Sequence, residues 1–588
     1  MSDEIIRIGN CSGFYGDRLS AAREMVEGGE IDVLTGDYLA ELTMAILFNQ
    51  KLKRGDRAGY VGTFLKQLKD VAQICSDKNI KIVTNAGGLN PKSMAEDAIQ
   101  LIESLDLDLK VAYITGDDLM AKIDKIKSSG EQLKNIDNQE DLFSKELPIV
   151  SANAYLGCWG IKKALDEGAD IVICPRVTDA AVVMGPAAWK YQWSQDDYDK
   201  LSGSLAAGHI IECGAQATGG NYSFFKEVPT FRNIGYPIAE IYEDGSFNIT
   251  KHHDTGGLVS KGTVTAQLLY EISSPQYLNP DVIGHFDTLE ISEIEKNKVY
   301  VSNVKGSPPP EKLKACINLA GGYKNGMELI ITGLDIEEKA KIFTDELFES
   351  LGGIEQFDDV SIQLYRTDKP NPITNEEAMA TLSINVKSQD PEKVGRIFSA
   401  KIVELALANY PGWTTQSDIK QGAPFISYWP TLVDRKYVEE IVHLGSKSFL
   451  VEDATHKEVA MPEIKNFTFD EKNYGELIEI EFGRVFGTRS GDKGGCANLG
   501  VWAKNLDSYK YLHTYLTVNK FKELLPDLKG YNIERFEFSN IWSLNFYVHG
   551  LLENGVSSNN RKDGQAKSLG EYLGAKNIDF PKSLAKIR

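Results

Sequence analysis

The first 180 residues alternate short apolar runs with stretches of helical periodicity, and this alternation constrains the fold more than any other feature. The apolar runs are short enough for buried strands, and the stretches between them are long enough for helices. This order is typical of βαβ units, which build a mainly parallel sheet with helices on its faces. The candidate strands are 5–8, 31–34, 81–84, 109–114 and 170–174.

The remaining sequence changes to the mixed order of α+β proteins. After a Gly-rich part with a hairpin at 239–250, residues 311–430 have the order βαββαβ, which is the ferredoxin-like pattern. We therefore expect an α/β fold, with an N-terminal, mainly parallel sheet flanked by helices and followed by ferredoxin-like α+β sandwich modules. The predicted parts are an α/β domain at 1–305, the module at 311–430, a connector at 431–475 with a short helix at 435–442, and a C-terminal α+β domain at 476–588.

The composition argues against several classes of protein. The formal net charge of −20 would repel a phosphate backbone, so we expect no nucleic acid as a partner. No apolar stretch approaches the roughly 20 residues that span a bilayer, and the acidic start at Met1 to Glu4 lacks the features of a signal peptide. The seven cysteines include no C-x-x-C pair, which indicates free thiols in a reducing compartment. A soluble, cytoplasmic protein without a membrane partner is expected.

Acidic residues and a histidine run are the candidates for acid–base catalysis. Asp37 and Asp117 each follow a predicted strand in the sequence Thr-Gly-Asp, where ligands bind in parallel sheets. Asp37 and Glu41 would lie one turn apart on one helix face, where two carboxylates push their pKa values apart and can divide the roles of acid and base. Asp after a strand is also a favoured helix cap. His252 and Asp254 lie in a His-His-Asp run. Because adjacent residues of an extended segment point to opposite sides, we expect no metal ion there.

A second set of residues predicts a site for an anionic substrate. Arg176 stands alone at a strand end, where it could grip a carboxylate or phosphate with two hydrogen bonds, or pair with a structural Asp. Arg489 and Lys493 stand among glycines whose N–H groups could form a nest for an anion, and a plain hairpin connection is the alternative. No motif indicates a cofactor. The predicted substrate-binding residues are Asn10, Ser12, Gly13, Asn85, Gly87, Gly88, Arg176, Asp179, Arg489 and Lys493.

Five segments of the chain match those of a known family. They are 9–17, 35–41, 84–91, 174–179 and 486–495. With these segments the chain resembles the acyclic terpene utilisation (AtuA-like) family over nearly its whole length, and 486–495 resembles the family's C-terminal ferredoxin-fold module. The resemblance implies a catabolic protein found beside acyl-CoA enzymes that degrade branched, terpenoid-derived acids.

Two functions from different classes are compatible with these observations. The first is an enzyme that acts on a branched acyl-CoA or carboxylate by acid–base hydration, dehydration or hydrolysis. The second is a noncatalytic subunit that binds an acyl-CoA and presents it to neighbouring enzymes. The density of ionisable residues at strand ends favours the enzyme, because a scaffold needs none there. We expect a small anionic substrate, no cofactor, and a homo-oligomer.

Overall fold

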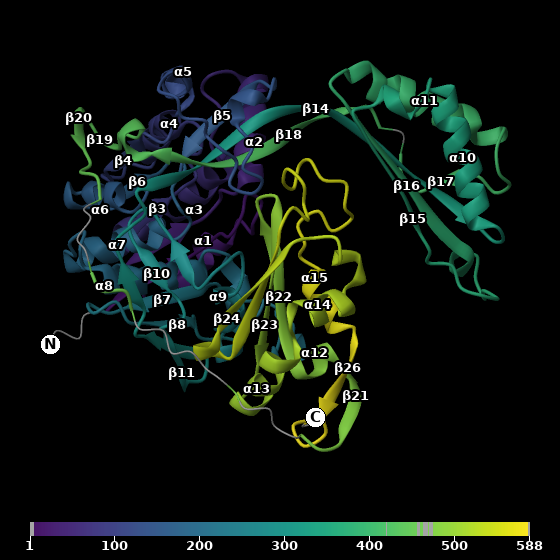
Figure 1. Cartoon of the computed structure of the whole chain (residues 1–588). Coiled ribbons are helices and arrows are strands. Elements are labelled where there is room, and N and C mark those ends of the chain that lie inside the picture. Colours follow the sequence, from purple (N-terminus) through teal and green to yellow (C-terminus); the bar gives the residue numbers. More distant parts are fainter. Residues whose placement is uncertain (1–4, 419, 455–458, 463–468, 470–473, 586–588) are drawn as a thin grey trace.

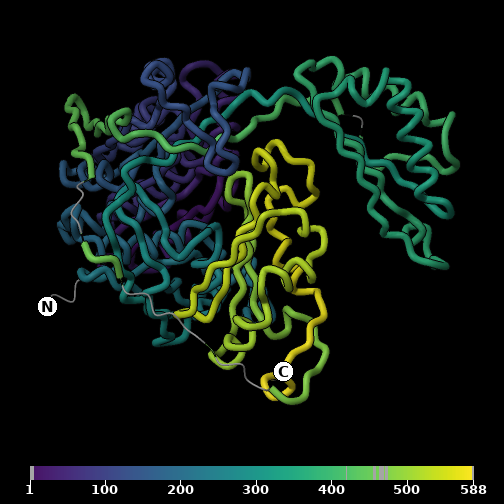
Figure 2. The backbone as a smooth tube through the Cα atoms, in the orientation of Figure 1, coloured from purple at the N-terminus to yellow at the C-terminus, as the bar shows by residue number. Residues whose placement is uncertain are grey.

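The computed structural model describes residues 5–418, 420–454, 459–462, 469 and 474–585. They form a body around one large sheet, a module that projects from this body on a two-stranded ribbon, and a C-terminal domain beside the body (Figure 1). The backbone trace shows the same three parts (Figure 2). The fold is mixed α/β, as the sequence predicts.

The centre of the large sheet consists of five adjacent parallel strands with helices on both faces. Alternate residues face opposite layers: Leu34 packs in one core, and its neighbour Val33 packs in the other. The strands, in sheet order, are β1 (Ile6–Asn10), β2 (Val33–Gly36), β3 (Lys81–Thr84), β6 (Ile171–Ile173) and β4 (Val111–Thr115). The helices are α1 (Ala21–Gly28), α2 (Glu41–Arg54), α3 (Gly62–Lys78) and α4 (Pro91–Ser104) in one core, and α6 (Trp159–Asp166), α7 (Ala181–Tyr191) and α8 (Tyr198–Ile211) in the other.

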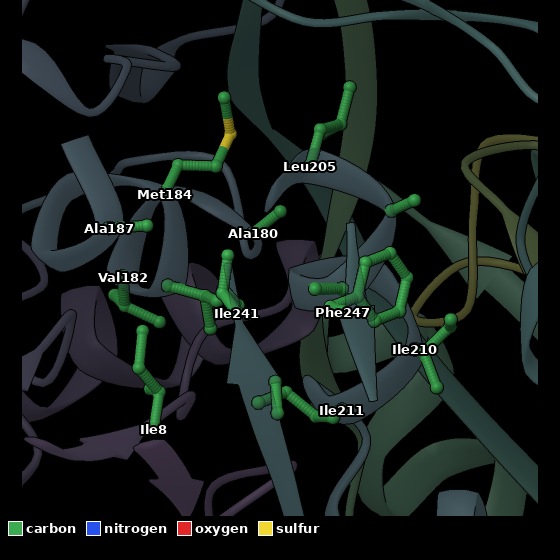
Figure 3. Packing of buried hydrophobic residues seen from close by; sticks show 14 of the residues in the cluster. Ile8, Ala180, Val182, Met184, Ala187, Leu205, Ile210, Ile211, Ile241 and Phe247 are labelled. Atoms are coloured by element: carbon green, nitrogen blue, oxygen red, sulfur yellow. The ribbon is translucent and has the colours of Figure 1, made fainter. Parts of the chain in front are cut away.

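The core beneath α7 and α8 is apolar and closely packed (Figure 3). It joins Val182 of α7 and Ile210 of α8 to Ile8 of β1. Almost every residue of α8 is buried, including the polar His209 near its end. This packing therefore fixes the carboxyl end of α8 against the ends of the parallel strands.

Antiparallel strands extend the sheet on both sides. The hairpin predicted at 239–250 is confirmed, with its turn at Asp244 and Gly245, and it lies beside β1. The helix predicted at 435–442 is wrong: the chain makes one 3-10 turn at Arg435–Tyr437 and then a hairpin that pairs with β4. Apolar residues alternate around its turn at Gly445, which is typical of strands. The added strands are β7 (Pro237–Ile241), β8 (Phe247–Lys251), β11 (Glu290–Glu295), β12 (Lys298–Ser302), β19 (Ile441–Leu444) and β20 (Lys447–Leu450).

The projecting module hangs on the long strand β14 (Lys312–Thr332). Its first half pairs with β5 and β18 beside the body, and its second half pairs with β16 in the module. The sheet order β15-β16-β14-β17 is that of a ferredoxin-like sheet. Sequence reasoning assigned only 328–332 of β14 to a strand and therefore did not foresee its half beside the body. The other elements are β5 (Ile149–Ala154), α10 (Ile336–Ser350), β15 (Asp359–Tyr365), β16 (Met379–Ser388), α11 (Phe398–Glu404), β17 (Thr414–Thr415) and β18 (Ala423–Asp434).

The C-terminal domain has a four-stranded antiparallel sheet in the order β22-β23-β25-β24. One face carries the domain's own core, which includes Leu499 and Phe546. The other face packs on the body, where Asn498 Nδ2 donates to the Leu269 carbonyl (2.6 Å) and Asn545 Nδ2 to the Ile272 carbonyl (2.7 Å). The elements are β21 (Leu477–Glu481), α12 (Phe482–Val485), β22 (Phe486–Lys493), β23 (Cys496–Ala503), α13 (Leu506–Tyr515), α14 (Val518–Leu524), β24 (Ile533–Phe538), β25 (Ser543–Val548), α15 (Leu569–Gly574) and β26 (Asn577–Pro581).

The C-terminal fragment 476–588 is expected to fold without the rest of the chain. Its helices and one sheet face enclose a separate apolar core, and Leu477 to Glu481 pair with the last strand, so both ends are held. Circular dichroism of the purified fragment should show α+β content and a cooperative thermal transition. A fragment without a cooperative transition would contradict this boundary.

The remaining elements connect these parts. Within the described residues, no helix combines the length and the apolar character needed to cross a bilayer. The remaining α-helices and β-strands are α5 (Ile123–Ser128), α9 (Lys261–Leu268), β9 (Gln276–Leu278), β10 (Ile283–His285) and β13 (Lys305–Ser307).

Candidate active site

Asp37 is a buried carboxyl group directly after β2. Its Oδ1 accepts hydrogen bonds from Asn85 Nδ2 (2.5 Å) and from the backbone N–H of Leu39 (3.2 Å). Asn85, which follows β3, also accepts from the Tyr38 N–H (2.8 Å) through Oδ1. The next helix, α2, has Ala40 as its N-cap without a side-chain hydrogen bond. The helix-cap interpretation of Asp37 is therefore wrong.

Arg176 is buried at the end of β6 and is held on several sides. Its Nη1 donates to Asp179 Oδ1 (2.9 Å) and to the Leu39 carbonyl (3.3 Å). Its guanidinium lies 4.2 Å from the ring centre of Tyr155. Asp117 accepts from Asn153 Nδ2 (2.7 Å) and from the Arg176 N–H (3.3 Å). Asp117 is thus also no helix cap, and it anchors the loop that carries Arg176.

Burial and neighbouring acidic groups raise the pKa of several carboxyl groups in this region. Burial and the nearby carboxylates of Asp179 and Glu212 raise the pKa of Asp37 well above its usual range. Burial and Asp179 raise the pKa of Glu212 in the same way. Burial raises the pKa of Asp117 to about 7. We call Asp37, Glu41, Arg176, Asp179 and Glu212 the strand-end cluster.

Glu41, one helical turn after Asp37, behaves in the opposite way. Its Oε1 accepts from the hydroxyls of Tyr155 (2.9 Å) and Tyr428 (3.2 Å) and lies 3.6 Å from Lys314 Nζ. Burial alone would raise the pKa of Glu41, but Lys314 and Arg176 lower it to about 2. The pKa values of two carboxyl groups close in sequence are therefore shifted in opposite directions.

The C-terminal domain reaches the strand-end cluster through the hairpin of β22 and β23. Arg489 Nη1 donates to the Asn221 carbonyl (3.1 Å), and its guanidinium lies 4.2 Å from the ring centre of Tyr270. Lys493 Nζ lies 5.7 Å from the ring centre of Tyr277, and its charge acts on the pKa of both Glu41 and Glu212. The segment expected as a nest of N–H groups is instead a strand paired with β23, so the nest interpretation is wrong. The two cations lie on the same face of that strand.

Several other predicted residues support the backbone around the cluster. Asn10 Nδ2 donates to the carbonyls of Ile211 (2.7 Å) and Glu212 (3.0 Å), and the Ser12 carbonyl accepts from the Asp37 N–H (3.0 Å). Gly13, Gly87 and Gly88 mark close approaches: a Cβ at Gly13 would meet the Cys213 backbone, one at Gly87 the Cys174 carbonyl, and one at Gly88 the side chain of Leu47.

His252 and Asp254 lie apart from the strand-end cluster. His252 is buried against Gly28 and Gly29, and its Nε2 lies 2.8 Å from the Met25 carbonyl. Both residues line a cavity of about 300 Å³ that no member of the cluster lines. A larger cavity of about 760 Å³, lined by Asp196 to Lys200 and Asn540, also lacks members of the cluster. The structure thus separates two of the residues predicted as catalytic, His252 and Asp254, from the other two, Asp37 and Asp117.

Sequence reasoning did not select several residues of this region. The pairs of Asp37 with Glu41 and of His209 with Glu212 were visible in the sequence, but neither glutamate was assigned a role in the site. Lys314 and Tyr428 come from β14 and β18, and no local pattern connects them to Asp37. Among the residues that the structure describes, no three His, Cys, Asp or Glu side chains are grouped as metal ligands.

Two family models cover most of the chain. The model of the acyclic terpene utilisation family protein AtuA matches residues 6–444, and that of the AtuA ferredoxin-like domain matches residues 480–579. No curated protein matches the chain. The first match includes the strand-end cluster, and the second includes β22 with Arg489 and Lys493. The chain belongs to the acyclic terpene utilisation (AtuA) family.

Proposed function

We propose that this protein is a catabolic enzyme that acts on a branched, terpenoid-derived acyl-CoA or carboxylate by acid–base hydration or dehydration. The opposite pKa shifts of Asp37 and Glu41 carry this proposal, because proton transfer at neutral pH requires a buried acid with a raised pKa beside fixed charges. The family's connection to acyclic terpene utilisation supports a catabolic role and the branched substrate.

The residues of the cluster divide the steps of a hydration between them. Asp179, whose carboxylate pairs with Arg176, takes a proton from water while the water oxygen attacks the β-carbon of an α,β-unsaturated acyl group. The electron pair moves to the carbonyl oxygen, and Arg176 stabilises the resulting enolate. Asp37 then donates its proton to the α-carbon, so that one molecule of water is added in all. A proton released by Asp179 to solvent and one taken up by Asp37 restore both groups. Dehydration is the reverse sequence.

Arg176 is suited to bind such an oxyanion. It is 2% exposed, and its Nε has no hydrogen-bond partner among the described residues. A buried N–H donor of this kind gains a partner when an anionic oxygen binds. The charges of Lys314 and Glu41 offset each other beside Arg176. The two side chains form an ion pair, and both contact Tyr155.

The test is whether the full-length protein adds water to such a substrate. Branched α,β-unsaturated acids and their CoA thioesters are incubated with the protein in deuterated water, and the products are analysed by mass spectrometry and proton NMR. We expect the gain of one water and the appearance of one solvent deuteron at the α-carbon. The saturated analogues serve as controls and should remain unchanged. Ligand binding without any chemical change in any of these substrates would contradict the proposal and favour a binding subunit.

A further inference from the structure

Several buried polar atoms beside the strand-end cluster have no hydrogen-bond partner among the described residues. They are Nε and Nη2 of Arg489, both side-chain amide atoms of Gln267, both ring nitrogens of His209 and Oε2 of Glu212. All four residues are at most 7% exposed. Unpartnered polar atoms are rare and costly in protein interiors, so their concentration in one place indicates a site for a polar ligand.

Contacts with Tyr270 and Tyr277 place Arg489 and His209 where the C-terminal domain meets the body. Gln267 lies in α9, three residues before the Tyr270 ring on which Arg489 is stacked. His209 and Glu212 are in contact near the end of α8, with 3.2 Å between Nδ1 and Oε1, although this contact lacks hydrogen-bond geometry. The ring centre of Tyr277 lies 5.0 Å from that of His209 and 5.7 Å from Lys493 Nζ.

The guanidinium of Arg489 is fixed so that one edge is free. Nη1 donates to the Asn221 carbonyl (3.1 Å), and the plane of the group lies over Tyr270. Nε and Nη2, which form the opposite edge, have no partner among the described residues. Two parallel N–H donors on one edge of arginine match the two oxygens of a carboxylate.

The nearby side chains offer neutral hydrogen-bond groups. Burial and the charge of Lys493 lower the pKa of His209 to about 4, so its ring is neutral at pH 7 and offers one donor and one acceptor. Gln267 adds an amide donor and an amide acceptor. Such groups suit a hydroxyl or carbonyl oxygen of an uncharged part of the ligand rather than a second charge.

We propose that Arg489 binds a free carboxylate of the substrate, so that the substrate class is a carboxylic acid bearing a second, reacting acyl group. The C-terminal domain then holds the carboxylate end, His209 and Gln267 contact the oxygen-bearing middle, and the strand-end cluster acts on the other end. The inference rests on the proposed function for the identity of the reacting end. Binding of the carboxylate end does not depend on it.

The test is a calorimetric titration of the full-length protein with 3-methylglutarate, with its diamide as the uncharged probe. The wild type and Asp37→Asn should bind the dicarboxylate and not the diamide. Arg489→Lys keeps the charge but loses the two-donor edge, so its affinity should fall at least about 10-fold. Arg484→Lys is the matched control, because Arg484 lies on the surface of the same domain, and its affinity should remain unchanged.

A second measurement protects the test against a folding defect. In Arg489→Ala, added guanidinium ion should restore part of the lost binding, which a misfolded protein would not show. Equal binding of dicarboxylate and diamide, no binding by the wild type, or wild-type affinity in Arg489→Lys would each overturn the inference. Retained carboxylate binding without turnover would instead count against the proposed function alone.

Discussion

Asp37→Asn is expected to lower turnover by about 10² to 10⁴-fold while leaving the melting temperature nearly unchanged, as for the loss of a general acid. Asn cannot donate a proton to the α-carbon, but its side-chain oxygen still accepts from Asn85 Nδ2 and from the Leu39 N–H. Because burial raises the pKa of Asp37 and so favours its neutral form, a neutral amide should be tolerated at this position. Steady-state kinetics and a thermal melt of the same preparation measure both quantities.

Asp118→Asn provides the matched control for this variant. Asp118 also follows a strand end, and its Oδ1 accepts from the N–H two residues later (2.8 Å), as that of Asp37 does. Its side chain is exposed, however, so we expect wild-type turnover. If Asp37→Asn loses stability and activity together, or keeps full turnover, Asp37 is structural and the acid must be another residue.

The part of the site that lies on successive strands could be predicted from the sequence. In a parallel sheet the carboxyl ends of the strands meet at one edge, so polar residues after β2, β3 and β6 must come close together. Asp37, Asn85 and Arg176 were selected by this reasoning, and the structure joins them through Asn85 and the Leu39 backbone. The same regular geometry explains why the order of strands and helices could be predicted.

The contributions from distant segments could not be predicted in the same way. Lys314 and Tyr428 reach Glu41 only because β14 and β18 form a ribbon beside the body, which is a pairing over more than a hundred residues. Strand β22 was missed because its glycines resemble a loop. Gly487 and Gly491 are required instead by packing, since a Cβ would meet the rings of Trp502 and Tyr270.

His252 shows the limit of selection by residue type. A histidine beside a histidine and an aspartate indicates acid–base chemistry. A buried histidine whose ring nitrogen lies 2.8 Å from a backbone carbonyl, as His252 Nε2 does from that of Met25, can equally have a structural role. The sequence gives no information on which ring nitrogen is free or which cavity the side chain lines. The catalytic roles of His252 and Asp254 stay a prediction, and their separation from Asp37 means that they would serve a different site.

Asp117→Asn is expected to change the pH dependence of stability, because Asp117 has different pKa values in the folded and unfolded chains. The folded protein keeps the proton of Asp117 up to about pH 7, whereas the unfolded chain releases it near the ordinary value of 3.8. Between these values the unfolded state binds fewer protons, so the contribution of Asp117 to the free energy of unfolding falls as pH rises. Above pH 7 both states are ionised and the loss is complete.

The asparagine variant carries no ionisable group at this position and should escape the loss. Its amide oxygen can still accept from Asn153 or from the Arg176 N–H. We therefore expect the two proteins to be similarly stable near pH 4, and the variant to be more stable at pH 8 by up to about 4 kcal/mol, the limit set by a shift of about three pH units. Urea unfolding at pH 4, 6 and 8 measures this difference.

Other buried carboxyl groups make the comparison with wild type essential. Burial also raises the pKa of Asp281 to about 6 and that of Asp492 to about 7, so the wild-type stability should fall with rising pH for several reasons at once. Only the difference between Asp117→Asn and wild type isolates one group. Asp124→Asn, at an exposed position in α5, should follow the wild-type curve. A variant that is less stable than wild type at pH 8 would mean that the Asp117 carboxylate stabilises the Arg176 loop by more than its burial costs.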